Sequence, residues 1–160
     1  DRVAHIKELM PHCCIGVDVI VGFPGETEED FSETYRFINE LDISYLHVFT
    51  YSERPNTLAA DMPGKVPMAL RRSRNEMLTI LSEKKRRFFY RQFAGQTREV
   101  LFENSTLADR MSGYSDNYIK VDAHLNQDLL NKVKPVLLGE MNSEGNVEIS
   151  MHPKQAKFMA

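Results

Sequence analysis

The stretch IGVDVIVGFPGET, residues 15–27, decides how this chain folds. Its first seven residues are mostly β-branched and apolar, which predicts a strand buried on both faces of a parallel sheet. Gly22 and Gly25 can take backbone conformations that are closed to other residues, and Pro24 fixes its own φ between them. A tight turn therefore follows the strand. Because ligands in α/β folds bind at the carboxyl ends of strands, we expect a site at this turn.

The residues after this turn predict a βαβ unit. Thr27 and Asp30 have the spacing of a capping box, and apolar residues at helical spacing follow as far as Leu41. Residues 45–51 are rich in aromatic and β-branched side chains, as in a strand. A strand, a helix and a second strand in this order imply a parallel pair with a right-handed crossover. Two strands make neither a barrel nor an open sheet, so we expect a piece of a larger domain.

The middle of the chain is a proline-bearing loop, residues 52–67, followed by a long basic helix from Met68. Leu70, Met77, Leu81 and Phe88 are predicted to share its apolar face. Residues 1–64 carry a net charge of −8, residues 65–91 one of +7, and residues 92–160 one of −2. The basic helix indicates either a nucleic-acid surface or, more commonly, an ordinary solvated face.

The last third of the chain predicts a small antiparallel β-barrel, a shape that often binds RNA. Short strand patterns occupy residues 97–102, 118–121, 136–140 and 147–150, and the last two flank the turn at residues 143–146. Residues 153–160 are expected to form a frayed tail. His47 and His124 fall in strand patterns and are predicted to be neutral core histidines.

Cysteine usage and hydropathy predict a cytoplasmic protein. Cys13 and Cys14 are the only cysteines and are neighbours, so a disulfide framework is not expected. With His12 they are too few for an ordinary zinc or iron–sulfur site, and buried thiols are the simpler interpretation. No apolar run is long enough to span a bilayer, and the N-terminus has no signal-peptide pattern.

Three separated motifs, in order, resemble one family. DVIVGFPGET (residues 18–27) and LHVFTYSERPNT (residues 46–57) are similar to the second half of the radical SAM domain of methylthiotransferases. GYSDNYIKV (residues 113–121) looks like the TRAM domain of those enzymes. The motifs are most similar to the tRNA enzymes that methylthiolate threonylcarbamoyladenosine beside the anticodon. The isopentenyladenosine branch is close behind, and the ribosomal-protein branch is less similar.

The resemblance implies an α/β fragment of a radical SAM partial (β/α) barrel followed by a small antiparallel TRAM barrel. The implied domains are residues 1–67 for the barrel part, 68–92 for a connecting helix and 93–160 for the TRAM-like part. The full-length enzyme would use S-adenosylmethionine and two [4Fe-4S] clusters. This sequence lacks the Cys-x-x-x-Cys-x-x-Cys triplet of the family. The chain alone is therefore expected to bind neither cluster and to be inactive, with the N-terminal remainder of the enzyme as its partner.

The resemblance also implies two sets of site residues. The predicted S-adenosylmethionine-binding residues are Gly22, Pro24, Gly25, Glu26, Tyr51, Ser52 and Arg54. The predicted RNA-binding residues, for a tRNA anticodon stem-loop, are Arg110, Tyr114, Tyr118 and Lys120. Stacking-capable rings beside phosphate-capable cations are typical of RNA-binding surfaces. An ion pair with the acidic N-terminal half is an equal alternative for Arg54. A non-catalytic RNA-binding module is the alternative of another class.

Overall fold

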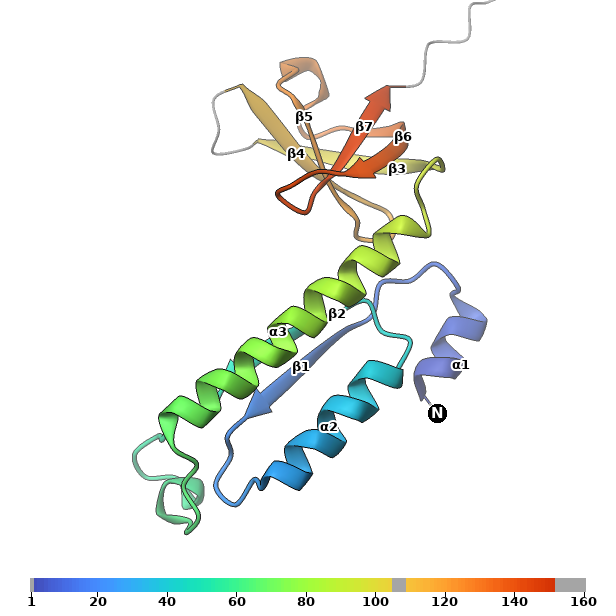
Figure 1. Cartoon of the computed structure of the whole chain (residues 1–160). Helices are drawn as coiled ribbons and strands as arrows, with labels where there is room; N and C mark the ends of the chain where they lie inside the picture. The colour runs from blue at the N-terminus through green and yellow to red at the C-terminus, as the bar shows by residue number, and fades with distance from the viewer. Residues whose placement is uncertain (1, 105–108, 152–160) are drawn as a thin grey trace, which may run out of the picture. The chain divides into compact units, whose positions relative to one another are not determined.

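A computed structural model describes residues 2–104 and 109–151, which form two compact units (Figure 1). Unit 1 holds the described residues up to Pro11 together with Ile15–Arg86. Unit 2 holds His12–Cys14 and the described residues from Arg87 onward. The boundary between the units falls inside one long helix, so residues 68–86 of the predicted connecting helix cluster with unit 1. The three-domain division at residues 67 and 92 stays a prediction.

Unit 1 contains the predicted βαβ unit. Its elements are α1 (Arg2–Leu9), β1 (Gly16–Val21), α2 (Glu28–Glu40), β2 (Tyr45–Thr50), the 3-10 turn η1 (Leu58–Asp61) and most of α3 (Met68–Arg91). The two strands pair in parallel and in register, from Gly16 opposite Tyr45 to Val21 opposite Thr50. The parallel pair predicted from the sequence is therefore confirmed.

The sheet of unit 1 is covered on one face only. Val17, Val19 and Val21 of β1, with Leu46 and Val48 of β2, pack against apolar side chains of α2 and α3. The buried partners from the two helices are Phe31, Ile38, Leu78 and Leu81. This arrangement places the core between the sheet and the helices.

The opposite face of this sheet is exposed. Ile20 and Phe49, which lie opposite each other in the register, are 59% and 52% exposed. Asp18 and His47 are exposed one pleat earlier. The expectation that residues 15–21 are buried on both faces was therefore wrong for the described chain. Both helices pack on the same face, and no described element lies on the other.

The outer edge of β2 is closed by side chains of α3. The Leu46 N–H donates to the Ser82 hydroxyl at 2.8 Å, and the same hydroxyl donates to the Leu46 carbonyl at 2.9 Å. The Asn75 amide donates to the Val48 carbonyl at 3.2 Å. Along the far edge of the sheet, no strand pairs with β1 in the described part of the chain. The sheet therefore has one closed edge and one open edge.

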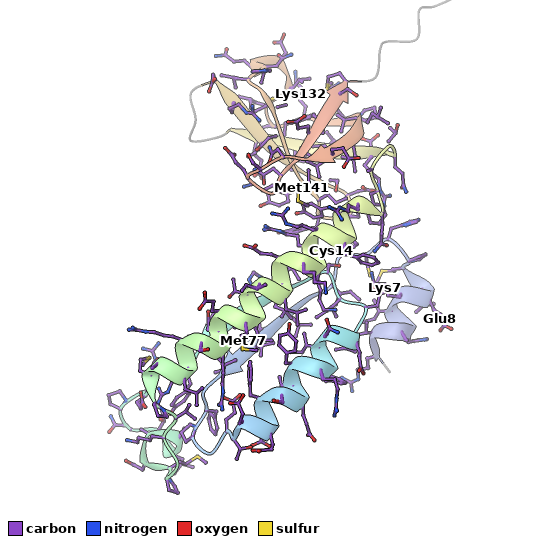
Figure 2. All side chains as sticks on the ribbon, viewed as in Figure 1. Lys7, Glu8, Cys14, Met77, Lys132 and Met141 are labelled. Carbon is purple, nitrogen blue, oxygen red and sulfur yellow. The ribbon has the colours of Figure 1, made fainter. Side chains whose placement is uncertain are left out.

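The buried face of α3 differs from the predicted one. Leu81 is buried as expected, but Leu70, Met77 (Figure 2) and Phe88 are all exposed. Arg71 and Arg74 are instead buried, with 3% and 2% of their surfaces exposed, beside Leu78. The prediction was wrong because it placed every arginine of the helix on the exposed face. An arginine can be buried when acidic residues are buried with it and form ion pairs with it.

Unit 2 is a small closed barrel of five strands with the order β3-β4-β5-β7-β6 (Figure 1). The strands are β3 (Thr97–Asn104), β4 (Arg110–Ser115), β5 (Lys120–His124), β6 (Val133–Met141) and β7 (Val147–Met151), with the 3-10 turn η2 (Gln127–Leu129) before β6. Four of the pairings are antiparallel, and β5 pairs with β7 in parallel. The predicted small barrel is confirmed, and so is the hairpin of β6 with β7, but the barrel is not wholly antiparallel as predicted, because β5 and β7 run side by side in the same direction.

The sequence reading missed β4 and misplaced Tyr118. β4 carries small and polar residues, and every second one faces the core, so its apolar signal is weak. Tyr118 lies in the turn between β4 and β5 with a positive φ of 67°. The predicted tail, residues 153–160, lies outside the described residues. No described helix is long and apolar enough to cross a membrane.

Candidate functional site

The turn after β1 is built by two glycines and a capping box. Gly22 and Gly25 have positive φ values of 79° and 90°. A Cβ on Gly22 would lie 2.3 Å from the Cγ of Arg71, so this position has neither the backbone freedom nor the room for a side chain. Thr27 and Asp30 make both bonds of the predicted capping box. The Thr27 N–H and hydroxyl both donate to the Asp30 carboxylate, and these two hydrogen bonds lower the pKa of Asp30. The turn therefore enters α2 in a fixed direction.

The segment after β2 lies beside this turn. The Tyr51 N–H donates to the Val21 carbonyl at 2.9 Å, which continues the ladder past the end of both strands. The rings of Phe23 and Tyr51 meet edge to face, with centroids 5.3 Å apart. The structure thus brings the two predicted groups, Gly22–Glu26 and Tyr51–Arg54, to the same carboxyl end of the sheet.

The hydroxyl of Tyr51 is a buried polar atom without a hydrogen-bond partner among the described residues. The ring itself is only half-buried, and the neighbouring Phe23 is exposed. A buried hydroxyl without a partner is costly and uncommon in folded proteins. The Nε of Arg74 is a second buried polar atom without a partner among the described residues, but the Arg74 guanidinium lies over the buried ring of Phe31, whereas the Tyr51 hydroxyl belongs to a half-buried ring beside exposed Phe23.

The ion pair of the second segment is made by Glu53 and not by its neighbour Arg54. The Arg71 guanidinium donates to both carboxylate oxygens of Glu53, at 2.7 and 3.2 Å. These hydrogen bonds lower the pKa of Glu53 to about 2. Ser52 and Arg54 are exposed, and no ion pair of Arg54 occurs within residues 2–104 and 109–151. The guanidinium of Arg54 therefore stands open to an incoming anion.

Glu26 already has two protein partners. Its carboxylate accepts a hydrogen bond from the Gly22 N–H and another from Arg74, the latter at 2.8 Å. Its side chain is 15% exposed. A direct bond from Glu26 to a ligand stays a prediction. In the structure, the Glu26 carboxylate binds the Gly22 N–H and so joins the last residue of the turn to the first.

The exposed sheet face carries two polar residues, one of which, His47, was predicted to lie in the core. Asp18 and His47 occupy opposite positions in the register of β1 and β2, and both are exposed. The His47 ring meets Tyr45 edge to face at 5.0 Å. The prediction of core histidines was wrong for His47 and also for His124, which is exposed at the end of β5. The strand pattern of residues 45–50 could have shown that His47 is exposed. Neighbouring residues of a strand point to opposite faces, and Leu46 is on the buried face.

Three of the four predicted RNA-binding residues gather at one end of the β4–β5 hairpin. Tyr114 and Lys120 are opposite each other in the register, and the rings of Tyr114 and Tyr118 lie 4.9 Å apart at an angle of 33°. Tyr118 is 60% exposed. Its ring therefore offers an open face, with an ammonium group on the adjacent strand.

Arg110 lies at the other end of the same hairpin. It is opposite His124, and its guanidinium is 3.8 Å from the carboxylate of Asp122. Asp122 also accepts a hydrogen bond from Asn146 at 2.6 Å. The structure therefore separates Arg110 from the two tyrosines and gives it an acidic neighbour.

The barrel surface extends this patch with two residues that the sequence reading missed. Leu101 of β3 lies opposite Tyr114 on one side and opposite Val133 of β6 on the other. Both Leu101 and Val133 are exposed. Val133, Leu101, Tyr114 and Lys120 thus form a row across four strands, which we call the barrel row. The register of the strand pairs determines which residues lie side by side in this row. A single sequence contains no direct signal of that register.

The cysteines do not form part of a metal centre in the described structure. Cys13 and Cys14 are half-buried and outside any disulfide, and Cys14 packs on the barrel core. Within the described ranges, no three His, Cys, Asp or Glu side chains are grouped closely enough to hold a metal ion.

The chain is similar to curated proteins with two different names. Threonylcarbamoyladenosine tRNA methylthiotransferase MtaB of Bacillus subtilis (strain 168) is 38% identical over 140 residues, which are 85% of this chain and 31% of that protein. The protein of the same name from Aquifex aeolicus (strain VF5) is 42% identical over 120 residues, 74% of this chain and 28% of that protein. The tRNA-2-methylthio-N(6)-dimethylallyladenosine synthase of Desulfitobacterium hafniense (strain Y51) is 33% identical over 144 residues, 89% and 32% of the two chains.

The chain spans less than a third of the length of each of these relatives. No protein-family model matches it.

Proposed function

This chain is homologous to the tRNA methylthiotransferases over most of its length, and we propose from that relationship that it is part of such an enzyme. The proposed reaction adds a methylthio group to a modified adenosine beside the tRNA anticodon, in the cytoplasm. The observation that carries the proposal is that the similarity runs through both compact units.

Unit 1 is proposed to be the last part of a radical SAM partial (β/α) barrel. Two features support this. The edge of β2 is closed by Ser82 and Asn75, whereas β1 is open to a further strand. The sheet face that carries Asp18 and His47 is exposed. In a complete barrel this face would be turned toward the interior, so in a segment of the barrel it is expected to be uncovered. Additional parallel strands would join at β1, and β2 would be the terminal strand.

The strand ends of unit 1 are proposed to hold part of the S-adenosylmethionine site. The backbone at Gly22, Pro24 and Gly25 would approach the nucleoside, with Glu26 behind it. Tyr51, Ser52 and Arg54 would line the other side. The buried hydroxyl of Tyr51, which lacks a partner among the described residues, supports a polar ligand here. When bound, S-adenosylmethionine supplies the radical and the methyl group, while these residues orient it and exclude water.

The iron–sulfur clusters do not fit this chain. Its two cysteines are adjacent, and the described residues form no group of three ligands. Cluster ligands would have to come from residues outside these 160.

Unit 2 is proposed to be the TRAM-type RNA-binding domain, with the anticodon stem-loop as its ligand. The two tilted, adjacent rings of Tyr114 and Tyr118 and the neighbouring Lys120 combine an aromatic surface with a cation. The net charge of −2 over residues 92–160 argues for weak binding that depends on these few contacts.

The substrate is proposed to be threonylcarbamoyladenosine. Dimethylallyl- or isopentenyladenosine is the second candidate, because a protein named tRNA-2-methylthio-N(6)-dimethylallyladenosine synthase is also similar over most of the chain. A ribosomal-protein substrate and a non-catalytic RNA-binding role are the remaining alternatives.

Deletion of the gene that encodes this chain separates these alternatives. Mass spectrometry of tRNA nucleosides should show loss of 2-methylthio-threonylcarbamoyladenosine and accumulation of its unthiolated precursor. Loss of the methylthio-isopentenyl nucleoside instead would assign the second substrate. Unchanged tRNA, together with loss of methylthiolation on a ribosomal protein, would assign the third. A gene without a Cys-x-x-x-Cys-x-x-Cys triplet would leave the non-catalytic role.

A further inference from the structure

Two buried arginines connect α3 to both halves of the candidate site. Arg71 and Arg74 are one helical turn apart and nearly inaccessible to solvent. Burying a guanidinium is costly unless it is paired and hydrogen-bonded. All three nitrogens of the Arg71 guanidinium and both Nη atoms of Arg74 donate hydrogen bonds, and the Nε of Arg74 has no partner among the described residues. Their partners therefore show what these residues do.

Arg71 holds the segment after β2. Its Nε donates to the Val66 carbonyl at 2.7 Å, and its Nη1 donates to the Tyr51 carbonyl at 3.0 Å. Both Nη atoms also bind Glu53. The guanidinium carbon lies 5.3 Å from the centre of the Tyr51 ring. Its aliphatic stem occupies the space that a side chain on Gly22 would need, so Arg71 touches both site segments.

Arg74 holds the turn after β1. Its Nη1 donates to the Glu26 carboxylate at 2.8 Å and to the Glu26 carbonyl at 3.2 Å. Its Nη2 donates to the Thr27 carbonyl at 3.0 Å and to the Glu28 carboxylate at 3.1 Å. The same Glu26 carboxylate binds the Gly22 N–H, so the two ends of the turn are tied to one guanidinium.

We infer that Arg71 and Arg74 are positioning residues that fix the Gly22–Glu26 turn and the Tyr51–Arg54 segment relative to each other. The inference rests on the proposed function, because it assigns these segments to S-adenosylmethionine. Neither arginine needs to touch the ligand. Replacing a buried ion pair by apolar residues is often neutral or stabilising, so stability alone gives no reason for two arginines here. Their partners are loop carbonyls and loop carboxylates at the strand ends, which is where a ligand must be oriented.

Substitution by lysine distinguishes the effect of the positive charge of Arg71 and Arg74 from the effect of their hydrogen-bonding geometry. A lysine at either position keeps the cation but has no planar fork to reach a backbone carbonyl and a carboxylate in different directions. The charge balance is retained, so these variants are expected to fold. Arg72, the exposed neighbour on the same helix, is the matched control.

The experiment uses the full-length gene product that contains this chain, as wild type and as Arg71→Lys, Arg74→Lys and Arg72→Lys. Hydrogen exchange of the ligand-free protein is measured in peptides covering residues 20–30 and 50–56, with residues 44–49 as the internal reference. Equilibrium dialysis gives the S-adenosylmethionine affinity, and circular dichroism gives the melting temperature.

Arg71→Lys and Arg74→Lys should raise exchange in the two site peptides and weaken S-adenosylmethionine binding about tenfold, because the loosened segments would have to be ordered when the ligand binds. Arg72→Lys should behave as wild type. Unchanged exchange and affinity in folded lysine variants would overturn the inference. If the lysine variants do not fold, Glu53→Gln carries the test, since it weakens one anchor from the exposed side. Unchanged exchange of residues 50–56 in Glu53→Gln would then overturn it.

Failure of the proposed function gives a different result. In that case the wild-type protein itself does not bind S-adenosylmethionine. If wild type binds and the lysine variants bind equally well, the proposed function stands and the positioning role is wrong.

Discussion

Arg71 and Glu53 face each other through two hydrogen bonds, Nη2 to Oε1 at 2.7 Å and Nη1 to Oε2 at 3.2 Å. One partner comes from the interior of α3 and the other from an exposed loop. The fork-to-fork geometry makes this pair directional. It also makes the loop sensitive to the protonation of a single carboxylate.

The first prediction is an acid-dependent loss of stability through Glu53. Its pKa is lowered from 4.5 to about 2 in the folded protein, so its stabilising effect is complete above pH 4.5. The effect is lost as the pH falls from 4.5 toward 2. The difference in melting temperature between wild type and Glu53→Gln should therefore shrink across this range. Glu83→Gln, at an exposed site on α3, should show no such trend. A constant difference for Glu53→Gln down to pH 2.5 would contradict the assignment.

The second prediction concerns the glycines of the turn. Gly25→Ala places a Cβ in open space at positive φ and should cost about 1–2 kcal/mol from backbone strain. Gly22→Ala adds a collision with the Arg71 stem to the same strain. It should cost about 2–4 kcal/mol. Urea unfolding of both variants measures the difference, and equal costs would show that Arg71 moves aside freely.

The third prediction concerns the closed edge of β2. Ser82→Ala removes the partner of both the N–H and the carbonyl of Leu46 and should cost about 1–3 kcal/mol. Ser73→Ala, the same substitution at an exposed position of α3, should change the unfolding free energy by less than about 0.5 kcal/mol. Denaturant unfolding provides both values. A Ser82→Ala cost as small as that of Ser73→Ala would mean that water replaces the hydroxyl.

The fourth prediction concerns RNA binding by unit 2. Tyr118→Ala should weaken binding of an anticodon stem-loop RNA about tenfold, because one stacked base is worth about 1–3 kcal/mol. Lys120→Ala should reduce the slope of log affinity against log salt by about one. Arg110→Ala should change this slope less, because Asp122 lies 3.8 Å from its guanidinium.

Fluorescence anisotropy at several salt concentrations measures these effects, with Lys65→Ala in unit 1 as the control. If Arg110→Ala flattens the slope more than Lys120→Ala does, the RNA contacts lie at the opposite end of the hairpin. Equal binding by wild type and Tyr118→Ala would remove the stacking role.

Local chemistry made much of the fold predictable. The capping box of Thr27 and Asp30 needs only residues three apart, and the turn glycines act through their own φ values. The parallel strand pair follows from the alternation of strand and helix patterns along the chain. The hairpin of β6 and β7 follows from the Gly- and Asn-bearing turn between them. The cap, the turn and the hairpin are each decided within a few residues of their signals, whereas the parallel pair follows from the order of the elements along the chain.

The errors arose where distant residues decide the outcome. Arg74 can be buried because it forms ion pairs with Glu26 and Glu28, which are almost fifty positions away in the sequence. The sequence of α3 contains no signal of these partners. Ile20 is exposed because both covering helices lie on one face. The barrel row depends on which residues of β3, β4 and β6 are opposite each other. The segments of the candidate site were predictable, but the residues that hold them were not.

The Ser82 hydroxyl, which closes the edge of β2, is synthesised later than the strand that it protects. Leu46 leaves the ribosome 36 residues before Ser82. At about 5–20 residues per second, the edge of β2 is uncovered for about 2–7 seconds. During this interval the nascent chain carries an unpaired strand edge next to exposed Phe49, a combination that favours pairing with another chain. Completion of α3 ends the interval, so a slow codon or a stall between Leu46 and Ser82 lengthens the exposure to aggregation.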